Sequence, residues 1–176
     1  KNQKIRADIN VKLIDMNKNI ELTTESITYL NKDQKIFTNG STEAEIFSKY
    51  NFKSDSLSYD INNMVLDSYE QTVLKDKTNF GKYELSSFKF KINDEFLKGT
   101  DIKVIENSNL PKGESNELLF KNGFFDLKNN IFKTGATQIN LRKNIFGNSK
   151  NDPRLLGISS SMQKDVTSVK KAVRSE

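Results

Sequence analysis

Apolar and polar side chains alternate with a period of two along most of the chain. The alternation is clearest in SSFKFKI, where Phe88, Phe90 and Ile92 share one face of an extended chain and Lys89 and Lys91 share the other. This pattern is typical of β-strands that are covered on one side and solvated on the other. It recurs in the segments NVKLID, IELTTESITY, EAEI, SLSY, TDIKVI and TQINL. The sequence therefore predicts an all-β fold.

Short polar segments separate the alternating runs. Asn, Asp and Gly accept turn dihedral angles and hydrogen-bond their own backbone, so these segments are expected to be turns. The expected turns are residues 17–19, 30–35, 60–63, 75–81, 108–115 and 128–130. The C-terminal segment MQKDVTSVKKAVRSE has Val166, Val169 and Val173 three and four residues apart. That spacing is compatible with a helix, a strand or a disordered end, and the pattern does not choose among them.

A two-strand unit recurs about every thirty residues, which is typical of repeat architectures. The four copies begin at Ser26, Ser56, Ser87 and Asn122. Each copy has an early aromatic residue, namely Tyr29, Tyr59, Phe90 or Phe125. A small residue follows at a similar offset, namely Gly40, Ser68, Gly99 or Gly135. We expect antiparallel strand pairs stacked side by side, since one pair alone cannot bury its apolar face, with the glycines marking bends.

The composition excludes several classes of function. The chain has no Cys, His or Trp, which removes disulfides, thiol and imidazole nucleophiles and the usual zinc ligands. Its net charge of +5 comes from lysines scattered among Asn and Asp, which favours a solvated surface and no nucleic-acid partner. An anionic partner such as a phosphorylated lipid remains open. No apolar run approaches the roughly 18 residues of a membrane helix, and the first residue, Lys1, leads us to expect a processed or excised piece.

The carboxylates do not form a recognisable catalytic or metal-binding motif. DINNMVLD, residues 60–67, lacks the central Gly and terminal Glu of a calcium loop and is expected to form a turn. Glu43 and Glu45 alternate with Ala44 and Ile46 and are expected to face water. We therefore predict no catalytic residue, metal or cofactor. The least favoured alternative is a carbohydrate-active β-sandwich with paired carboxylates, whose separation a sequence does not reveal.

The apolar strand face leaves two architectures open. It lines a dry core if the sheet closes into a sandwich. It lines an elongated apolar trough, suited to acyl chains, if a repeated sheet folds on itself without a covering layer. The alternation pattern alone does not decide between them.

The repeats, in TTESITYLNKDQKIFTNGSTEAEI and KSDSLSYDINNMVLDS, resemble the OstA-like β-jellyroll family that is shared by LptA, LptC and the N-terminal part of LptD. The later stretch FFDLKNNIFKTGATQINLRKNIFGNSKNDPRLLGISSS looks most like the periplasmic domain of the lipopolysaccharide-assembly protein LptD. The resemblance covers about residues 5–160. Two features depart from LptD: the cysteines that flank its periplasmic domain are absent, and so is a barrel.

This resemblance implies an elongated, V-shaped β-jellyroll (β-taco) over residues 1–145 and a C-terminal extension, 146–176, toward an outer-membrane barrel. The implied function is non-enzymatic lipopolysaccharide transport in the periplasm of a Gram-negative bacterium, in which an apolar groove shields the acyl chains of lipid A. The groove would be lined by Leu22, Ile27, Tyr29, Ile46, Leu57, Tyr59, Phe88, Phe90, Ile102, Val104, Phe125, Ile139 and Leu141.

The resemblance also implies the partners. An LptA-type jellyroll would add a strand near residues 9–13, and the end around residues 139–148 would face the barrel and its plug lipoprotein. Two alternatives remain. One is a structural or adhesive β-repeat protein with a closed core, and the other is a stand-alone LptA-like bridge protein.

Overall fold

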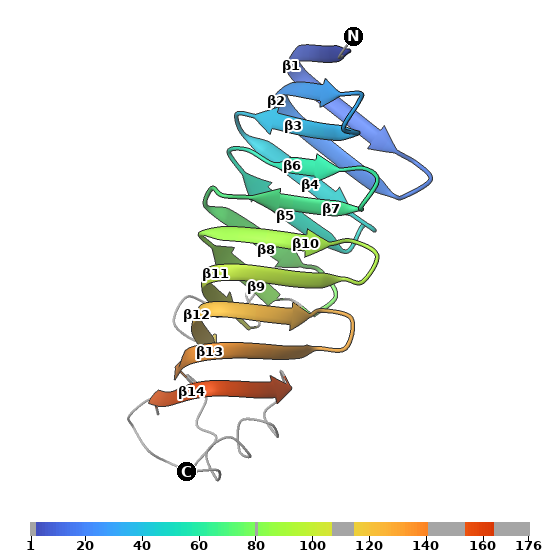
Figure 1. Cartoon of the computed structure of the whole chain (residues 1–176). Coiled ribbons are helices and arrows are strands. Elements are labelled where there is room, and N and C mark those ends of the chain that lie inside the picture. Colours follow the sequence, from blue (N-terminus) through green and yellow to red (C-terminus); the bar gives the residue numbers. More distant parts are fainter. Residues whose placement is uncertain (1–2, 80, 107–114, 141–153, 164–176) are drawn as a thin grey trace.

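The computed structural model describes residues 3–79, 81–106, 115–140 and 154–163. These residues form fourteen antiparallel strands and no helix (Figure 1). The first seven are β1 (Lys4–Asp15), β2 (Ile20–Leu30), β3 (Lys35–Asn39), β4 (Thr42–Ile46), β5 (Tyr50–Ser54), β6 (Ser58–Asp60) and β7 (Val65–Ser68). The others are β8 (Thr72–Asp76), β9 (Gly81–Leu85), β10 (Ser87–Lys91), β11 (Phe96–Ile105), β12 (Glu117–Asp126), β13 (Ile131–Asn140) and β14 (Arg154–Gln163). The expected all-β class is confirmed.

One continuous sheet folds along a line into two walls. β2 shows the folding, because its residues 20–23 pair with β4 while its residues 26–30 pair with β3. β11 bends in the same way between β10 and β9. The front wall contains β3, β6, β7 and β10, and the back wall contains β4, β5, β8 and β9 (Figure 1). The longer strands β1, β2, β11, β12 and β13 pair along their whole length and pass from one wall to the other.

Between β2 and β11 the chain also passes from wall to wall, but it is interrupted at the fold line. Each passage therefore consists of two short strands, one on each wall, such as β3 and β4. Ten strands, from β10 through β2 to β11, are consequently linked by hydrogen bonds into a closed ring. The ring is flattened, because its members lie in two facing walls (Figure 1). The repeated antiparallel pairs expected from the sequence are confirmed.

The fold line, which we call the crease, is built by local shifts in strand alternation. In β2 the buried positions are Ile20, Leu22 and Thr24 before the crease but Ile27 after it. An odd number of steps between Thr24 and Ile27 keeps the apolar face inside although the strand changes direction. In β11 the same change follows Gly99, and Asp101 has a φ of 45°.

Buried hydroxyl groups line the inside of the crease. The Thr42 hydroxyl lies 2.8 Å from that of Thr24, 2.9 Å from that of Thr38 and 2.8 Å from the carbonyl oxygen of Gly40. Farther along the crease, Thr72 donates to Ser54 at 3.1 Å. Backbone polar groups that leave the ladder at a bend need partners, and these hydroxyls supply some of them.

Glycine is required where the chain turns between β3 and β4. Gly40 has a φ of +85°, and a Cβ atom there would approach the Glu25 side chain to 2.4 Å. The predicted bend at Gly40 is therefore confirmed, and its cause is both backbone conformation and space.

Opposite the crease, the turns of the two walls form two rows, and we call the line between them the mouth. The front row contains the turns 31–34, 61–64, 92–95 and 127–130, and the back row contains 16–19, 47–49 and 77–79. Asp-x-x-Asn sequences build several of them: Asp60 accepts a hydrogen bond from the Asn63 amide at 2.9 Å, and Asp126 does the same for Asn129. Most of the turns expected from the sequence are thus confirmed, while residues 108–114 lie outside the described residues.

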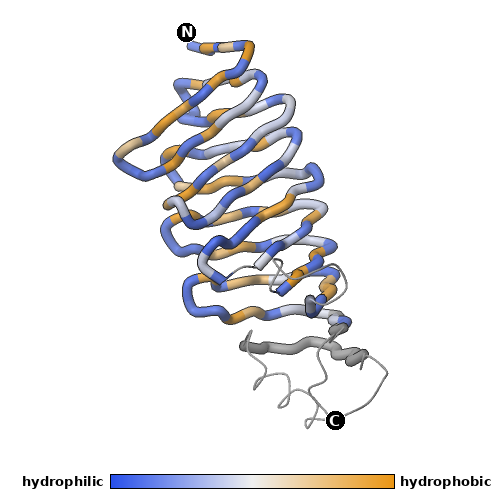
Figure 2. The backbone as a smooth tube through the Cα atoms, turned by 180° about the vertical axis from the view of Figure 1, so that it is seen from behind, coloured by the Kyte–Doolittle hydropathy of each residue, from blue (hydrophilic) through white to orange (hydrophobic). Residues whose placement is uncertain are grey.

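The hydropathy along the chain alternates on both walls (Figure 2). At the C-terminal edge, β14 pairs with β13, inside the segment expected to be an extension. The domain boundary at 145 stays a prediction, and the tail 164–176 lies outside the described residues. Among the described residues, no helix is long and apolar enough to cross a membrane.

Candidate functional site: the apolar interior between the walls

The space between the walls is filled by the apolar face of both. Of the thirteen residues predicted to line a groove, ten are buried members of this interior. They are Leu22, Ile27, Ile46, Leu57, Tyr59, Phe88, Phe90, Ile102, Val104 and Phe125. Their inward orientation is as expected from the alternation. Contact of these residues with lipid stays a prediction.

The other three residues differ. Tyr29 is only partly buried and packs against the interior from its edge, where its hydroxyl donates to Asn31 at 3.2 Å. Ile139 belongs to β13, but its side chain lies outside the described residues. Leu141 lies outside them altogether.

The interior also contains large residues outside the predicted groove list, although the alternation already places Ile92 on the face of Phe88 and Phe90. These are buried on the inner face: Ile20, Ile36, Tyr50, Phe52, Leu66, Leu74, Tyr83, Leu85, Ile92, Leu97, Leu118, Phe120, Leu127 and Phe132. The alternation of Tyr50, Phe52 and Ser54, or of Tyr83 and Leu85, carries the signal that identifies them.

Aromatic rings connect the two walls directly. Phe90 on the front wall contacts Tyr50 and Phe52 on the back wall, with ring centroids 5.4 and 5.2 Å apart. Nearer the C-terminal end, Tyr83 meets Phe125 edge to face at 5.6 Å. Such pairs are favourable beyond the area they bury. In this structure the middle of the interior is therefore closed and filled by side chains.

The tyrosine hydroxyls of the interior are kept neutral. Burial raises the pKa of the Tyr59 hydroxyl to about 12, and this hydroxyl donates to the Met64 sulfur at 3.2 Å. Burial also raises the pKa of Tyr50 and of Tyr83 well above the ordinary value for tyrosine. These hydroxyls are consequently neutral at physiological pH, and the apolar side chains around them offer a surface that suits a hydrocarbon ligand.

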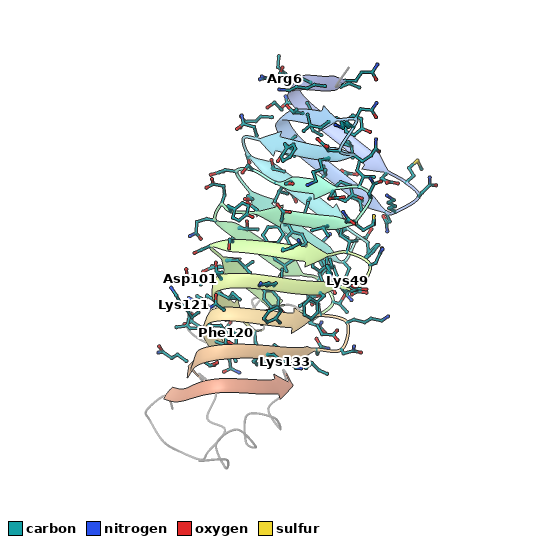
Figure 3. All side chains as sticks on the ribbon, in the orientation of Figure 1. Arg6, Lys49, Asp101, Phe120, Lys121 and Lys133 are labelled. Carbon is teal, nitrogen blue, oxygen red and sulfur yellow. The ribbon has the colours of Figure 1, made fainter. Side chains whose placement is uncertain are left out.

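Side chains tie the two walls together across the mouth. Glu95 of the front row accepts hydrogen bonds from the Lys49 ammonium and the Tyr50 hydroxyl of the back wall, both at 2.5 Å. On either side along the mouth, Lys18 donates to the carbonyl oxygen of Ile61 at 3.2 Å, and Asn79 donates to Asn130 at 3.0 Å. Figure 3 shows Lys49 at the edge of the molecule where the mouth turns lie.

The central contact is electrostatically stabilised. Burial alone would raise the pKa of Glu95, but the hydrogen bonds from Lys49 and Tyr50, with the charges of Lys49 and Lys128, hold that pKa below its ordinary value. The carboxylate is therefore ionised at neutral pH. The Lys49 ammonium also lies 4.8 Å from the centre of the Tyr50 ring. Lys49, Glu95 and Tyr50 form a compact polar closure over the aromatic interior.

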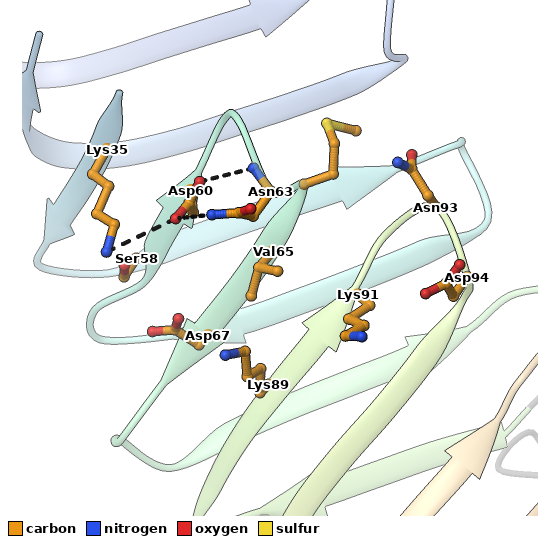
Figure 4. A pocket seen from close by; sticks show the side chains of 11 residues that line it. Lys35, Ser58, Asp60, Asn63, Val65, Asp67, Lys89, Lys91, Asn93 and Asp94 are labelled. Atoms are coloured by element: carbon orange, nitrogen blue, oxygen red, sulfur yellow. Dashed lines mark hydrogen bonds and ion pairs between the residues drawn. The ribbon is translucent and has the colours of Figure 1, made fainter. Parts of the chain in front are cut away.

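A polar hollow of about 420 Å³ lies on the outer face of the front wall (Figure 4). Its lining residues carry both charges: Lys35, Ser58, Asp60, Asn63, Met64, Val65, Asp67, Lys89, Lys91, Asn93 and Asp94. Asp60 is held by Asn63 and lies 3.8 Å from Lys35. The Asp60 carboxylate here serves its turn and an ion pair.

Glu43 and Glu45 on the back wall form ion pairs with lysines. Glu43, which is exposed as expected, pairs with Lys53 at 2.9 Å, and the half-buried Glu45 pairs with Lys77 at 2.9 Å. Among the described residues, no group of three acidic side chains is placed to hold a metal ion.

The N-terminal end of the interior is less covered than its middle. β1 pairs only with β2 among the described strands, and its inward residues Ala7, Val11 and Leu13 are only partly buried. Ile5 and Ile14 on the same strand are 60% and 55% exposed. An apolar strand with an unpaired edge is a site for pairing with another chain.

No family model matches the sequence, and a comparison with curated proteins gives no match. The structure is similar to the crystal structure of LptH, described as the LptA homologous periplasmic component of the conserved lipopolysaccharide transport device from Pseudomonas aeruginosa. The TM-score is 0.58 at 14% sequence identity, over 83% of this chain and 99% of LptH. At this identity the similarity establishes a common fold, and we conclude that the chain has the fold of a LptA-like protein.

Proposed function

We propose that this protein moves lipopolysaccharide through the periplasm as a non-enzymatic conduit, with the acyl chains of lipid A held between the two walls. The observation that carries the proposal is a continuous apolar interior that extends from β2 to β13 of a folded sheet, in a fold shared with a periplasmic component of a lipopolysaccharide transport device. Such an interior shields hydrocarbon from water over several strands.

The proposed binding state is a V-shaped β-jellyroll in which the walls part at the mouth. In that state the ten buried residues of the predicted groove, with Tyr29 and Ile139 at its ends, contact acyl chains in place of the opposite wall. The crease, with its covalent continuity and buried hydroxyls, stays intact. The sugar and phosphate groups of the lipid remain outside, where lysines of the turns meet them.

The proposed partners are like jellyroll domains and an outer-membrane barrel. The unpaired edge and partly exposed interior of β1 support the addition of an LptA-type domain at the N-terminal end. The resemblance of residues 151–161 to LptD supports a barrel with its plug lipoprotein at the other end, in a Gram-negative outer membrane. A stand-alone bridge protein would keep the first partner and lack the second.

A second function is favoured by a different observation. The rings of Phe90, Tyr50 and Phe52 join the walls, and these residues are fully buried. A structural or adhesive β-repeat protein with a permanently closed core would have this packing. It would bind no lipid.

A probe with an environment-sensitive fluorophore on an acyl chain distinguishes the two functions. The conduit predicts enhanced fluorescence with the purified protein, reversed by purified lipopolysaccharide but not by its polysaccharide freed of lipid A. A closed scaffold predicts no enhancement at any protein concentration, and that result would refute the proposed function.

A further inference from the structure

The two rows of turns at the mouth are each continuous along their own wall. Backbone hydrogen bonds of 2.9 to 3.0 Å join one turn to the next within a row. In the front row they are Ile61 to Gln34, Ile92 to Met64 and Leu127 to Glu95, and in the back row they are Phe47 to Asn19 and Lys77 to Lys49. Each wall is therefore a mechanically connected unit up to its rim.

Between the rows, the described residues make side-chain contacts and no backbone-to-backbone hydrogen bond. The contact between Lys49 and Glu95 is central, and these side chains are 25% and 19% exposed. Water still reaches this ion pair and partly screens it, so it closes the mouth only weakly. Separation of the rows breaks this ion pair and three further hydrogen bonds, which are donated by Tyr50, Lys18 and Asn79, and it leaves the backbone ladder of each wall intact.

Glu95 combines an unusual backbone conformation with a position near two cations. Its φ of 50° lies in the left-handed region, which costs a residue with a Cβ atom free energy. Its carboxylate also faces two cations, because Lys128 of the next front-row turn acts on it together with Lys49. If the carboxylate swings out, both ammonium groups are left at the rim above the aromatic interior.

We propose that the mouth is a lateral gate closed by Lys49, Tyr50 and Glu95, and that a phosphate group of the entering lipid opens it by replacing the Glu95 carboxylate at Lys49 and Lys128. The lipid part of this inference rests on the proposed function. A phosphate carries more charge and more acceptor oxygens than a carboxylate, so it binds the two lysines more strongly. The acyl chains then enter beside the displaced turn.

The gate is tested first without any lipid. Because the chain has no cysteine, Ser48→Cys with Asn93→Cys places two spin labels on opposite rows beside the central contact. Glu95→Asn removes the charge and tolerates the left-handed backbone, and it is expected to lengthen and broaden the measured distance distribution. The control pair Asn62→Cys with Asn93→Cys lies within the front row and is expected not to change. An unchanged Ser48–Asn93 distance would overturn the gate.

The phosphate exchange is tested with two variants that break the same contact. Glu95→Asn leaves the lysines free and is expected to tighten binding of purified lipopolysaccharide by about two- to fivefold. Lys49→Met removes a cation and is expected to weaken binding by a similar factor. Lipopolysaccharide with a dephosphorylated lipid A is expected to distinguish the two variants far less. The exchange would be overturned if both variants changed the affinity for lipopolysaccharide in the same direction. It would also be overturned if removal of the lipid A phosphates left the difference between the variants unchanged.

Free phosphate is the remaining source of such an anion. Inorganic phosphate at matched concentration is expected to leave the Ser48–Asn93 distance unchanged, because the Glu95 carboxylate is tethered beside the lysines whereas free phosphate is not held there by acyl chains. A lengthened distance with phosphate alone would overturn the lipid assignment. If no variant binds lipopolysaccharide although Glu95→Asn opens the mouth, the proposed function fails and the gate stands.

Discussion

Phe90 illustrates how one residue determines both wall contact and register. Its ring is fully buried between the walls, while Lys89 and Lys91 on either side of it are exposed. Because side chains alternate along a strand, a slip of one residue would exchange these environments. The alternation in SSFKFKI is therefore sufficient to orient this strand, and the structure confirms that orientation.

Replacement of Phe90 by Ala is expected to lower the free energy of unfolding by about 3–5 kcal/mol, because it leaves a cavity against Tyr50 and Phe52. Lys91→Ala on the outer face is the matched control and is expected to change it by less than about 0.5 kcal/mol. Denaturant unfolding measures both. A small effect at position 90 with a large one at 91 would mean that the register is wrong.

Asp67 gives a pH-dependent prediction at the residue scale. Burial raises its pKa above the ordinary 3.8, against the lowering effect of Lys89 and Lys35. Because the folded-state pKa is above the unfolded one, the favourable contribution exists below 3.8 and is lost as the pH rises through the folded-state pKa. Asp67→Asn is therefore expected to raise the free energy of unfolding at pH 7, and with it the thermal midpoint. The gain is expected to be less than about 1 kcal/mol, because water still screens the site.

The difference between Asp67→Asn and the parent protein is expected to disappear near pH 3, where both side chains are neutral. Thermal unfolding at a series of pH values measures it. A lower midpoint at pH 7 for Asp67→Asn would show that the lysines, and not burial, dominate at this carboxylate.

Among the elements, the crease is expected to depend on its buried hydroxyl groups. Thr42 is 2% exposed and lies at the centre of three hydrogen-bonding contacts. Thr42→Val keeps the side-chain shape but leaves these partners unsatisfied, so it is expected to cost about 1–3 kcal/mol. Thr42→Ser keeps the hydroxyl and is expected to cost less. If Ser is the more damaging replacement in denaturant unfolding, packing of the methyl group holds the crease instead.

At the same scale, the sequence predicts strand faces and turns well because both depend on neighbouring residues. Alternation orients Phe88 and Phe90, and Asp-x-x-Asn chemistry explains the turn at Asp60. The closing contact between Lys49 and Glu95 could not be predicted, since 46 residues separate the two in sequence. The pairing of crease hydroxyls such as Thr24 and Thr42 was missed for the same reason, as it depends on which strands fold against which.

At the scale of the whole molecule, the state of the mouth decides whether the interior is an open groove or a closed core. The described interior is closed, yet the two walls are joined covalently and by hydroxyls at the crease, and by a few polar side chains at the mouth. Closed and open forms would thus differ mainly in the cross-wall contacts of residues such as Phe90 and Tyr50. Exchange of those contacts for acyl chains would replace one apolar surface by another.

The β1 edge gives a prediction about assembly. Ile5 and Ile14 are exposed on a strand whose second edge pairs with none of the described strands, so the protein is expected to self-associate as its concentration rises. Ile5→Lys with Ile14→Lys is expected to shift the association to higher concentration. Tyr69→Lys, at a residue 90% exposed near the crease, is the control and is expected to leave it unchanged. Sedimentation measures all three, and a parent protein that stays monomeric throughout would contradict this expectation.

The central claim is that the interior admits lipid, and site-specific photocrosslinking tests it most directly. A photoreactive residue replaces Tyr59, which is 2% exposed inside, or Ser58, which lies on the outer face of the same strand, in cells that make lipopolysaccharide. The account predicts a light-dependent lipopolysaccharide adduct at position 59 and none at 58. A folded and exported protein without an adduct at 59 would contradict it.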